Sequence, residues 1–327
     1  MGDSIIGLGA IQYLKKIIPN SRITYGLPSW IIPLYSKVKT SANDFLNIDF
    51  KNPEDLIRLY KDLFNKKYDL VFELHQSKRT GRFYGLNSKI FNYSYYYHNH
   101  HRQADESSFV RDQGQKKPII QRDLDGIWGG LSDYTEETLN VPNYLNFYPQ
   151  MKLSDDHVGS NKIIFGVTGT RWTKLWPLEN YFELAKQILT LKSSIEILIP
   201  LSNSKMDQII ENKLNSLGLP PQCKIIKRPL DELPTIVEGA KFYVGNDTGL
   251  KHLCIALGMK TFSFFGPEEP MEWHPYDRSK HHYFFIDNLE CRTRISHYCP
   301  LNECDSMICL KDITPISVLE NIKSQLK

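Results

Sequence analysis

Most of the chain alternates short apolar runs with longer amphipathic segments, and this alternation constrains the fold most. Five runs are rich in β-branched or aromatic residues and are typical of buried strands: 68–74, 162–168, 195–201, 241–245 and 260–266. Three segments carry apolar residues at helical spacing: 178–192, 204–218 and 249–258. Strands that alternate with helices form βαβ units around a parallel sheet. We therefore predict a doubly wound α/β domain over about 160–312.

The first half follows the same order less regularly. Helices are predicted over 2–19 and 56–67, each followed by a strand, at 21–27 and 68–74. From about 85 to 125 the periodicity is lost, which predicts a long loop. A polar, turn-rich segment at 154–162 marks the predicted domain boundary. The expected division is thus 1–157, 158–312 and a C-terminal helix at 313–327.

Composition excludes several classes of protein. A chain of 327 residues that is 41% hydrophobic can build a large core, which excludes a disordered protein. A formal charge of +3 gives no overall electrostatic signature of a nucleic-acid binder. No run approaches the roughly 20 apolar residues of a membrane helix, and the first residues do not form a secretory leader. We therefore expect a cytoplasmic protein without a nucleic-acid partner.

Two predicted strand ends carry groups suited to an anion. In 241–258 the turn Asp247-Thr248-Gly249 joins a strand to a helix, whose first amides and dipole favour a phosphate. An ordinary helix cap by Asp247 or Thr248 is an equally good interpretation. In 162–177, turn amides, the Thr170 hydroxyl and the Lys174 ammonium could stabilise a diphosphate leaving group, although a solvated Lys174 is the alternative. Neither segment is a Walker sequence, and the first residues lack a dinucleotide fingerprint.

Cysteine and histidine clusters do not predict a metal site. Four of the six cysteines lie near the end of the chain, at Cys291, Cys299, Cys304 and Cys309. Their spacing lacks the tight CxxC pairs of structural zinc sites, so a structural loop is the favoured interpretation. His98, His100 and His101 have no carboxylate at a supporting spacing, and a loop is expected there as well.

Four segments together resemble glycosyltransferase family 9, the bacterial lipopolysaccharide heptosyltransferases. They are GDSIIGLGAIQYLKKIIPNSRITY, TGTRWTKLWP, VGNDTGLKHLCIALG and FFGPEEPMEWHPY, and they occur in the family's order. The resemblance implies the GT-B fold, two Rossmann-like doubly wound domains facing a cleft, with the acceptor in the first domain and the donor in the second. It implies an inverting, metal-independent transfer of a heptose from an ADP-heptose to the inner core of lipopolysaccharide. The nucleotide sugar is then a substrate, and no cofactor is expected.

The resemblance also implies roles for individual residues. Asp3 becomes the catalytic base that removes a proton from the acceptor hydroxyl, with a helix N-cap as the structural alternative. Asp247 is expected to bind sugar hydroxyls. The donor phosphates are expected at Thr170, Lys174, Thr248, Gly249, Leu250 and His252, although a lone histidine on a helix is more often a packing residue.

A local excess of positive charge suggests where an anionic acceptor binds. Residues 66–122 contain 11 Lys and Arg against 5 Asp and Glu. Lys78, Arg79 and Arg82 follow the predicted strand 68–74, where the family receives phosphate and carboxylate groups of its acceptor. Contact with an anionic membrane leaflet also fits this charge, as does a solvated loop. We expect the enzyme at the cytoplasmic face of the inner membrane.

The chain departs from the family pattern in two informative places. The buried strand that precedes the Gly-Asp pair in the family is missing before Asp3, so the first strand of the first domain is expected to be absent. In the segment where the family often has a glutamate that binds the donor ribose, the only acidic residue of this chain is Asp207. Two other functions stay open: a non-catalytic nucleotide-sugar-binding relative, and a GT-B epimerase or hydrolase acting on a nucleotide sugar.

Overall fold

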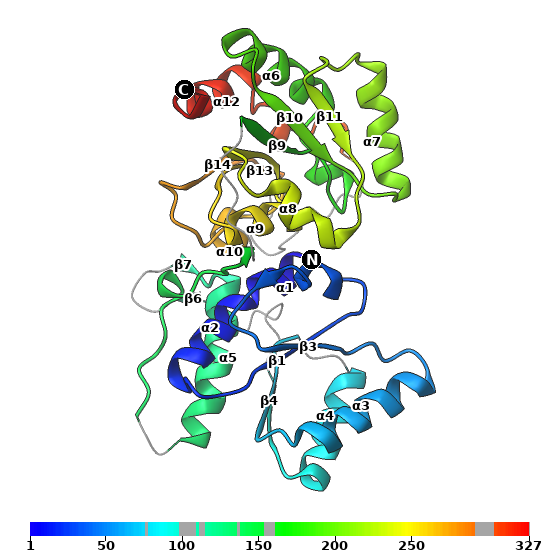
Figure 1. Cartoon of the computed structure of the whole chain (residues 1–327). Coiled ribbons are helices and arrows are strands. Elements are labelled where there is room, and N and C mark those ends of the chain that lie inside the picture. Colours follow the sequence, from blue (N-terminus) through cyan, green and yellow to red (C-terminus); the bar gives the residue numbers. More distant parts are fainter. Residues whose placement is uncertain are drawn as a thin grey trace. The chain divides into compact units, whose positions relative to one another are not determined.

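The chain divides into two compact units in the computed structural model (Figure 1). The structure describes residues 1–75, 78–97, 109–110, 115–135, 138–153, 161–291 and 304–326. The C-unit comprises Met1–Ile5 and Met151–Lys327, and the N-unit comprises Ile6–Gln150. The predicted boundary between 157 and 158 lies outside the described residues. Residues 1–5, which the sequence assigns to the first domain, group by contact with the C-unit.

The C-unit is built on a six-stranded parallel sheet. Its strands are β9 (Lys162–Gly166), β10 (Glu196–Pro200), β11 (Cys223–Ile226), β12 (Phe242–Asn246), β13 (Lys260–Phe265) and β14 (His281–Phe285). They lie in the order β11-β10-β9-β12-β13-β14, with every neighbouring pair parallel. This is the doubly wound order of a Rossmann fold, in which the winding direction reverses between the first and fourth strands, here β9 and β12. The predicted parallel α/β domain is confirmed.

Helices cover both faces of this sheet. α6 (Leu178–Leu191), α7 (Lys205–Ser216) and α12 (Pro315–Ile322) place Ile188, Ile210 and Val318 in one core with the strands. α9 (Gly249–Ala256) packs on β12 and β13. Shorter elements complete the unit: β8 (Lys152–Leu153), η4 (Trp172–Lys174), η5 (Leu230–Glu232), α8 (Leu233–Val237), α10 (Pro270–Trp273), α11 (Ile308–Lys311) and η6 (Lys323–Leu326). The three predicted helices α6, α7 and α9 are confirmed.

The N-unit pairs its strands two at a time. α1 (Gly2–Ile6), whose last residue belongs to this unit, leads into α2 (Leu8–Ile17). β1 (Thr24–Leu27) pairs in parallel with β3 (Asp44–Asn47), and β4 (Leu70–Glu73) with β5 (Ser94–Tyr97). The remaining elements are η1 (Ile32–Tyr35), β2 (Val38–Lys39), α3 (Pro53–Lys66), α4 (Lys78–Phe91), β6 (Phe109–Val110), β7 (Gln115–Lys116), α5 (Ile119–Tyr134) and η3 (Tyr144–Asn146).

The long loop predicted from about 85 to 125 is wrong for the residues described there. The segment contains the end of α4, the strand β5 and the start of α5. Leu86 and Ile90 of α4 are about three-quarters exposed, which hides the usual split between an apolar and a polar helix face. The run of tyrosines forms the strand β5 instead of a loop, with Tyr95 and Tyr96 half-buried and Tyr97 exposed. Residues 98–108 and 111–114 lie outside the described part.

Within the described ranges, none of the helices has both the length and the apolar content that crossing a bilayer requires.

Candidate active site

Three loops at the carboxyl edge of the C-unit sheet form the candidate site. They follow β9, β12 and β13 and cover residues 167–175, 247–249 and 266–269. β9 and β12 are the strands between which the winding direction reverses, and doubly wound folds bind ligands outside the carboxyl ends of such strands. The two segments that the sequence singled out as anion sites therefore meet at the point where the topology favours a ligand.

Asn246 fastens the first two loops together. Its side chain is fully buried at the end of β12, where its Oδ1 accepts a hydrogen bond from the backbone N–H of Trp176 at 2.9 Å. Its Nδ2 donates to the backbone carbonyl of Thr168 at 3.1 Å. One amide side chain therefore satisfies both a donor and an acceptor of the loop after β9, and it sets the position of that loop relative to β12.

Replacing Asn246 by alanine should loosen both loops. The free energy of unfolding should fall by about 2–6 kcal/mol, because each of the two buried backbone groups left without a partner costs about 1–3 kcal/mol. Urea unfolding measures this loss, and nucleotide affinity should fall with it. Asn321→Ala is the matched control, since the Asn321 amide bonds only to the exposed backbone of its own helix. Equal losses for the two variants would contradict the fastening role of Asn246.

Asp247 lies between two lysines. Its Oδ1 accepts a hydrogen bond from the fully buried Lys251, and its Oδ2 is 3.7 Å from Lys174 Nζ. Lys251 also donates to the carbonyl of Trp273 at 3.0 Å and lies over the ring of Phe265. Burial by itself raises the pKa of Asp247, but the charges of Lys251 and Lys174 outweigh it and hold that pKa below its usual range. Asp247 is therefore an ionised acceptor at neutral pH.

A second carboxylate, from the loop after β13, also faces Lys174. Glu268 is almost completely buried; its Oε1 pairs with Arg171 and lies 3.4 Å from Lys174 Nζ. Burial raises the pKa of Glu268, and the charges of Lys174 and Arg171 oppose that rise. Lys174 is thus mostly buried, with only 17% of its side chain exposed, so the solvated-lysine interpretation is wrong. Three cations and two carboxylates leave this cluster with a net positive charge.

No described side chain caps the start of α9. Thr248 is its N-cap residue but makes no capping hydrogen bond, and the Asp247 carboxylate is held by lysines, so neither forms the simple cap considered from sequence. The backbone approaches closely here: a Cβ on Gly249 would lie 2.9 Å from the backbone nitrogen of Gly2. A side chain at position 249 would therefore displace the first residues of the chain.

Asp3 lies beside this helix start. Its neighbour Gly2 packs against Gly249 and against the ring of His252, within the C-unit. Asp3 is exposed and belongs to the first turn of α1, so it is not the N-cap, and no described residue donates a hydrogen bond to its carboxylate. The candidate base therefore follows directly after a residue that contacts the candidate phosphate cradle.

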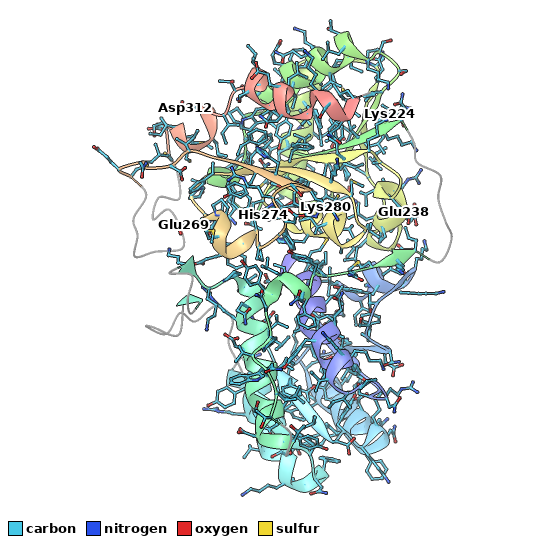
Figure 2. All side chains as sticks on the ribbon, turned by 90° about the vertical axis from the view of Figure 1, so that its left-hand side faces the viewer. Lys224, Glu238, Glu269, His274, Lys280 and Asp312 are labelled. Carbon is cyan, nitrogen blue, oxygen red and sulfur yellow. The ribbon has the colours of Figure 1, made fainter. Side chains whose placement is uncertain are left out.

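Buried histidines near α9 are neutral. His252 Nδ1 lies 2.7 Å from the hydroxyl of Tyr276, and burial lowers the pKa of His252 well below its usual value. His274, which follows α10 and is labelled in Figure 2, donates from Nε2 to the carbonyl of His281 at 2.8 Å. Burial also lowers the pKa of His274. His252 can therefore support a ligand through a hydrogen bond but not through charge.

Some predicted residues lie apart from this cluster. Thr170 is exposed, and the structure gives it no contact with Lys174 or Asp247. Arg79 and Arg82 are exposed on α4 of the N-unit, and Arg79 reaches the carbonyl of Phe50 at 3.4 Å; the side chain of Lys78 lies outside the described part. Asp207 accepts hydrogen bonds from the backbone and hydroxyl of Ser202, so one of its oxygens is used within the loop that leads into α7.

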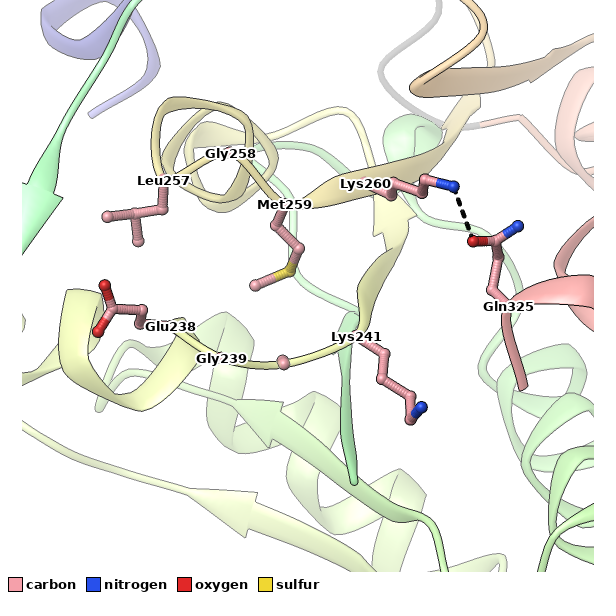
Figure 3. Close-up of a pocket in the computed structure, with 9 residues that line it drawn as sticks. Glu238, Gly239, Lys241, Leu257, Gly258, Met259, Lys260 and Gln325 are labelled. Carbon is pink, nitrogen blue, oxygen red and sulfur yellow. Dashed lines mark hydrogen bonds between the residues drawn. The ribbon is translucent and has the colours of Figure 1, made fainter. Parts of the chain in front are cut away.

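The hollow of about 390 Å³ shown in Figure 3 lies at the opposite edge of the sheet. Its lining comes from the residues before β12, such as Lys241, from those before β13, such as Met259, and from Gln325, whose amide oxygen accepts a hydrogen bond from Lys260 at 2.9 Å. Doubly wound folds bind ligands at the carboxyl ends of their strands, whereas this hollow lies at the amino ends. It is therefore not part of the candidate site.

Sequence reasoning missed four residues of the cluster. Lys251 could have been found, because it follows Asp247 by four residues and such pairs meet on one helix face. Asn246 was visible in the turn but gave no sign of its two loop contacts. Arg171 and Glu268 are separated by 97 positions, and no local pattern links them.

The described cysteines and histidines form no recognisable metal site. Within the described ranges, no three His, Cys, Asp or Glu side chains are grouped closely enough to hold a metal ion. Cys291, Cys304 and Cys309 are free thiols. Cys299 and His98, His100 and His101 lie outside the described residues.

Comparisons with known proteins agree with this architecture. Residues 56–304 match the model of "Glycosyltransferase family 9 (heptosyltransferase)". The chain is 23% identical over 310 residues to lipopolysaccharide heptosyltransferase 3 of Escherichia coli, covering 90% of this chain and 88% of the relative. It resembles the structure of the E. coli ADP-heptose lipopolysaccharide heptosyltransferase II, with a TM-score of 0.70 and 19% identity, covering 99% of this chain and 95% of that one.

A further solved structure is described with a nucleotide. The E. coli heptosyltransferase WaaC with ADP is similar at a TM-score of 0.65 and 21% identity, covering 99% of this chain and 97% of that one. These structural likenesses establish the GT-B fold that the sequence predicted. Because the family model spans most of the chain, the protein belongs to glycosyltransferase family 9 (heptosyltransferase) and is a glycosyltransferase enzyme.

Proposed function

We propose that this enzyme transfers a heptose from ADP-heptose to the inner core of lipopolysaccharide, with inversion and without a metal ion. The observation that carries the proposal is the positively charged cluster at the ends of β9 and β12, beside the uncapped start of α9. A helix start and a buried ammonium together suit a nucleotide diphosphate. The named relatives support a heptose donor, and WaaC with ADP supports adenine as the base.

The donor phosphates would bind between Lys174 and the start of α9. Lys174 would leave its two carboxylate neighbours for the phosphates, and the backbone N–H groups of Thr248, Gly249 and Leu250 would donate to phosphate oxygens. Thr170 would add its hydroxyl from the exposed part of the same loop, and neutral His252 would support the phosphate end through hydrogen bonds. These donors are in place before charge develops on the leaving diphosphate, which lowers the barrier.

The sugar would lie between Asp247 and Asp3. Asp247 keeps an ionised oxygen, Oδ2, 3.7 Å from Lys174, and this oxygen can accept hydrogen bonds from sugar hydroxyls. Asp3 would remove the proton from the attacking acceptor hydroxyl, so that one direct displacement inverts the anomeric carbon. Lys174, Arg171 and Lys251 bring positive charge to the diphosphate, and on this basis we propose that no metal is required.

The acceptor would be held by the N-unit. The first turns of α4, the helix that follows β4, carry Lys78, Arg79 and Arg82. This segment has a marked excess of basic residues. Guanidinium groups suit the phosphate and carboxylate groups of an inner-core sugar. Such an acceptor is anchored in lipid, so we place the enzyme at the cytoplasmic face of the inner membrane in peripheral contact with its anionic lipids.

Calorimetric titration with ADP, UDP and GDP tests the donor site. We expect ADP to bind at least about tenfold more tightly than UDP or GDP, equivalent to 1.4 kcal/mol. Its affinity should be the same in EDTA and in magnesium, because side chains supply the positive charge. Preference for UDP or GDP would contradict the ADP-sugar, and binding only with a metal would contradict metal independence.

A further inference from the structure

Two neighbouring helices of the N-unit expose an unusual set of apolar side chains. The most exposed are Phe64 of α3 and Leu86 and Ile90 of α4, at 70%, 75% and 73%. Ile57 and Tyr60 of α3 are also exposed. Scattered single apolar residues are normal on a protein surface, whereas a contiguous group marks a binding surface. We call these five side chains the α3–α4 face.

The five residues form one continuous face. On α3, Ile57, Tyr60 and Phe64 are three and four residues apart, so they lie along one side of the helix. Tyr60 then bridges to α4: its ring lies 5.1 Å from that of Phe83, and its hydroxyl is 3.5 Å from the Asn87 amide. Leu86 and Ile90 stand on the exposed side of α4, each one residue from a position that faces Tyr60. Figure 1 shows the two helices running beside each other.

Basic residues share this face. Lys61 lies among the apolar residues of α3, and Arg79, Arg82 and Lys89 lie on the side of α4 that carries Leu86 and Ile90; all four are exposed. α4 contains no acidic residue.

Two of the three acidic side chains of α3 are already engaged in hydrogen bonds and ion pairs. Asp55 is buried in the capping box of the helix and bonded to Arg58, and Asp62 bonds to Lys66 and Tyr68. Glu54 is the one exposed carboxylate of the two helices. Exposed cations therefore clearly outnumber exposed carboxylates on this surface.

We propose that the α3–α4 face docks the enzyme on an anionic lipid bilayer. Apolar side chains of this size insert at the boundary between headgroups and acyl chains, and neighbouring lysines and arginines attract anionic headgroups. A protein partner would need no such excess of cations. The inference rests on the proposed function in one respect: Arg79 and Arg82, assigned there to the acceptor, adjoin the face, as a lipid-anchored acceptor requires.

Sedimentation with vesicles tests the docking. The full-length enzyme should bind vesicles containing phosphatidylglycerol and should bind phosphatidylcholine vesicles weakly, with binding that falls as salt rises. The triple variant Phe64→Ser, Leu86→Ser, Ile90→Ser should lower the partition coefficient by at least about tenfold. Lys61→Glu with Lys89→Glu should weaken binding mainly at low salt. Ile209→Ser with Ile316→Ser is the matched control, because both residues are similarly exposed on the C-unit and should leave binding unchanged.

Other outcomes would overturn the proposal. They are wild-type protein that does not bind anionic vesicles, a triple variant that binds like wild type, and a dimer in sedimentation velocity that the triple variant abolishes. A soluble, deacylated acceptor separates this inference from the proposed function. The triple variant should use that acceptor as well as wild type does, whereas failure of the proposed function would appear as loss of ADP binding with vesicle binding retained.

Discussion

Asp3→Asn is expected to lower kcat for sugar transfer by about 10²–10⁴-fold, the range that a general base contributes. The substitution keeps the shape of the side chain and removes its ability to take a proton. Asp3 is exposed beside the start of α9, and no described residue donates a hydrogen bond to its carboxylate, so stability should not change. Donor affinity should also stay within about twofold, because Asp3 is not assigned to the phosphates.

The measurement is steady-state transfer combined with calorimetric titration of ADP. Glu54→Gln is the matched control, since Glu54 is an exposed acidic residue in the first turn of another helix. It should leave kcat unchanged. An Asp3→Asn enzyme that turns over like the wild type would exclude Asp3 as the base, and a loss of ADP affinity equal to the loss of kcat would assign it to donor binding instead.

Lys174→Met should lower kcat by about 10²–10³-fold, the usual cost of removing one preorganised donor to a developing negative charge. Affinity for ADP should fall as well, because in the proposed role the ammonium contacts the diphosphate before and during the reaction. Lys186→Met provides the control, since Lys186 is an exposed lysine of α6 that pairs with Glu183. Stopped-flow or coupled assays of ADP release measure the effect.

A structural role for Lys174 can be separated from a phosphate role. Without Lys174, Glu268 keeps Arg171 as its ion-pair partner but loses a second positive neighbour. If Lys174 served only to neutralise Glu268, the double variant Lys174→Met, Glu268→Gln would regain activity and stability together. We expect it to regain stability while kcat stays low. Recovery of kcat would contradict the phosphate role.

The location of the candidate site could be predicted from sequence because its signals are local. A strand, a short polar turn and a helix follow one another around Asp247, and a second strand ends in the loop that carries Lys174. Parallel strands place such ends at one edge of a sheet. The buried strands could also be predicted from local sequence. β9 and β10 are apolar on both faces, as strands covered by helices must be.

The contacts within the site could not be predicted, because they join distant positions. Asn246 reaches the loop after β9 across 70 and 78 positions of sequence, and Glu268 reaches Arg171 across 97. In the N-unit, the end of α4, from about residue 85, was taken for a loop because Leu86 and Ile90 are exposed where a simple amphipathic pattern expects polar residues. β14 begins with two histidines, which concealed its strand character.

Acceptor-dependent release of ADP from ADP-heptose is the measurement that tests the central claim most directly. With a deacylated inner-core acceptor, in EDTA, we expect ADP and glycosylated acceptor to form in equal amounts, with inverted configuration at the new bond. Without acceptor, release should fall to background. Release of ADP without acceptor would indicate a hydrolase or epimerase, and tight ADP binding with no product would indicate a non-catalytic relative; either result would contradict the assignment.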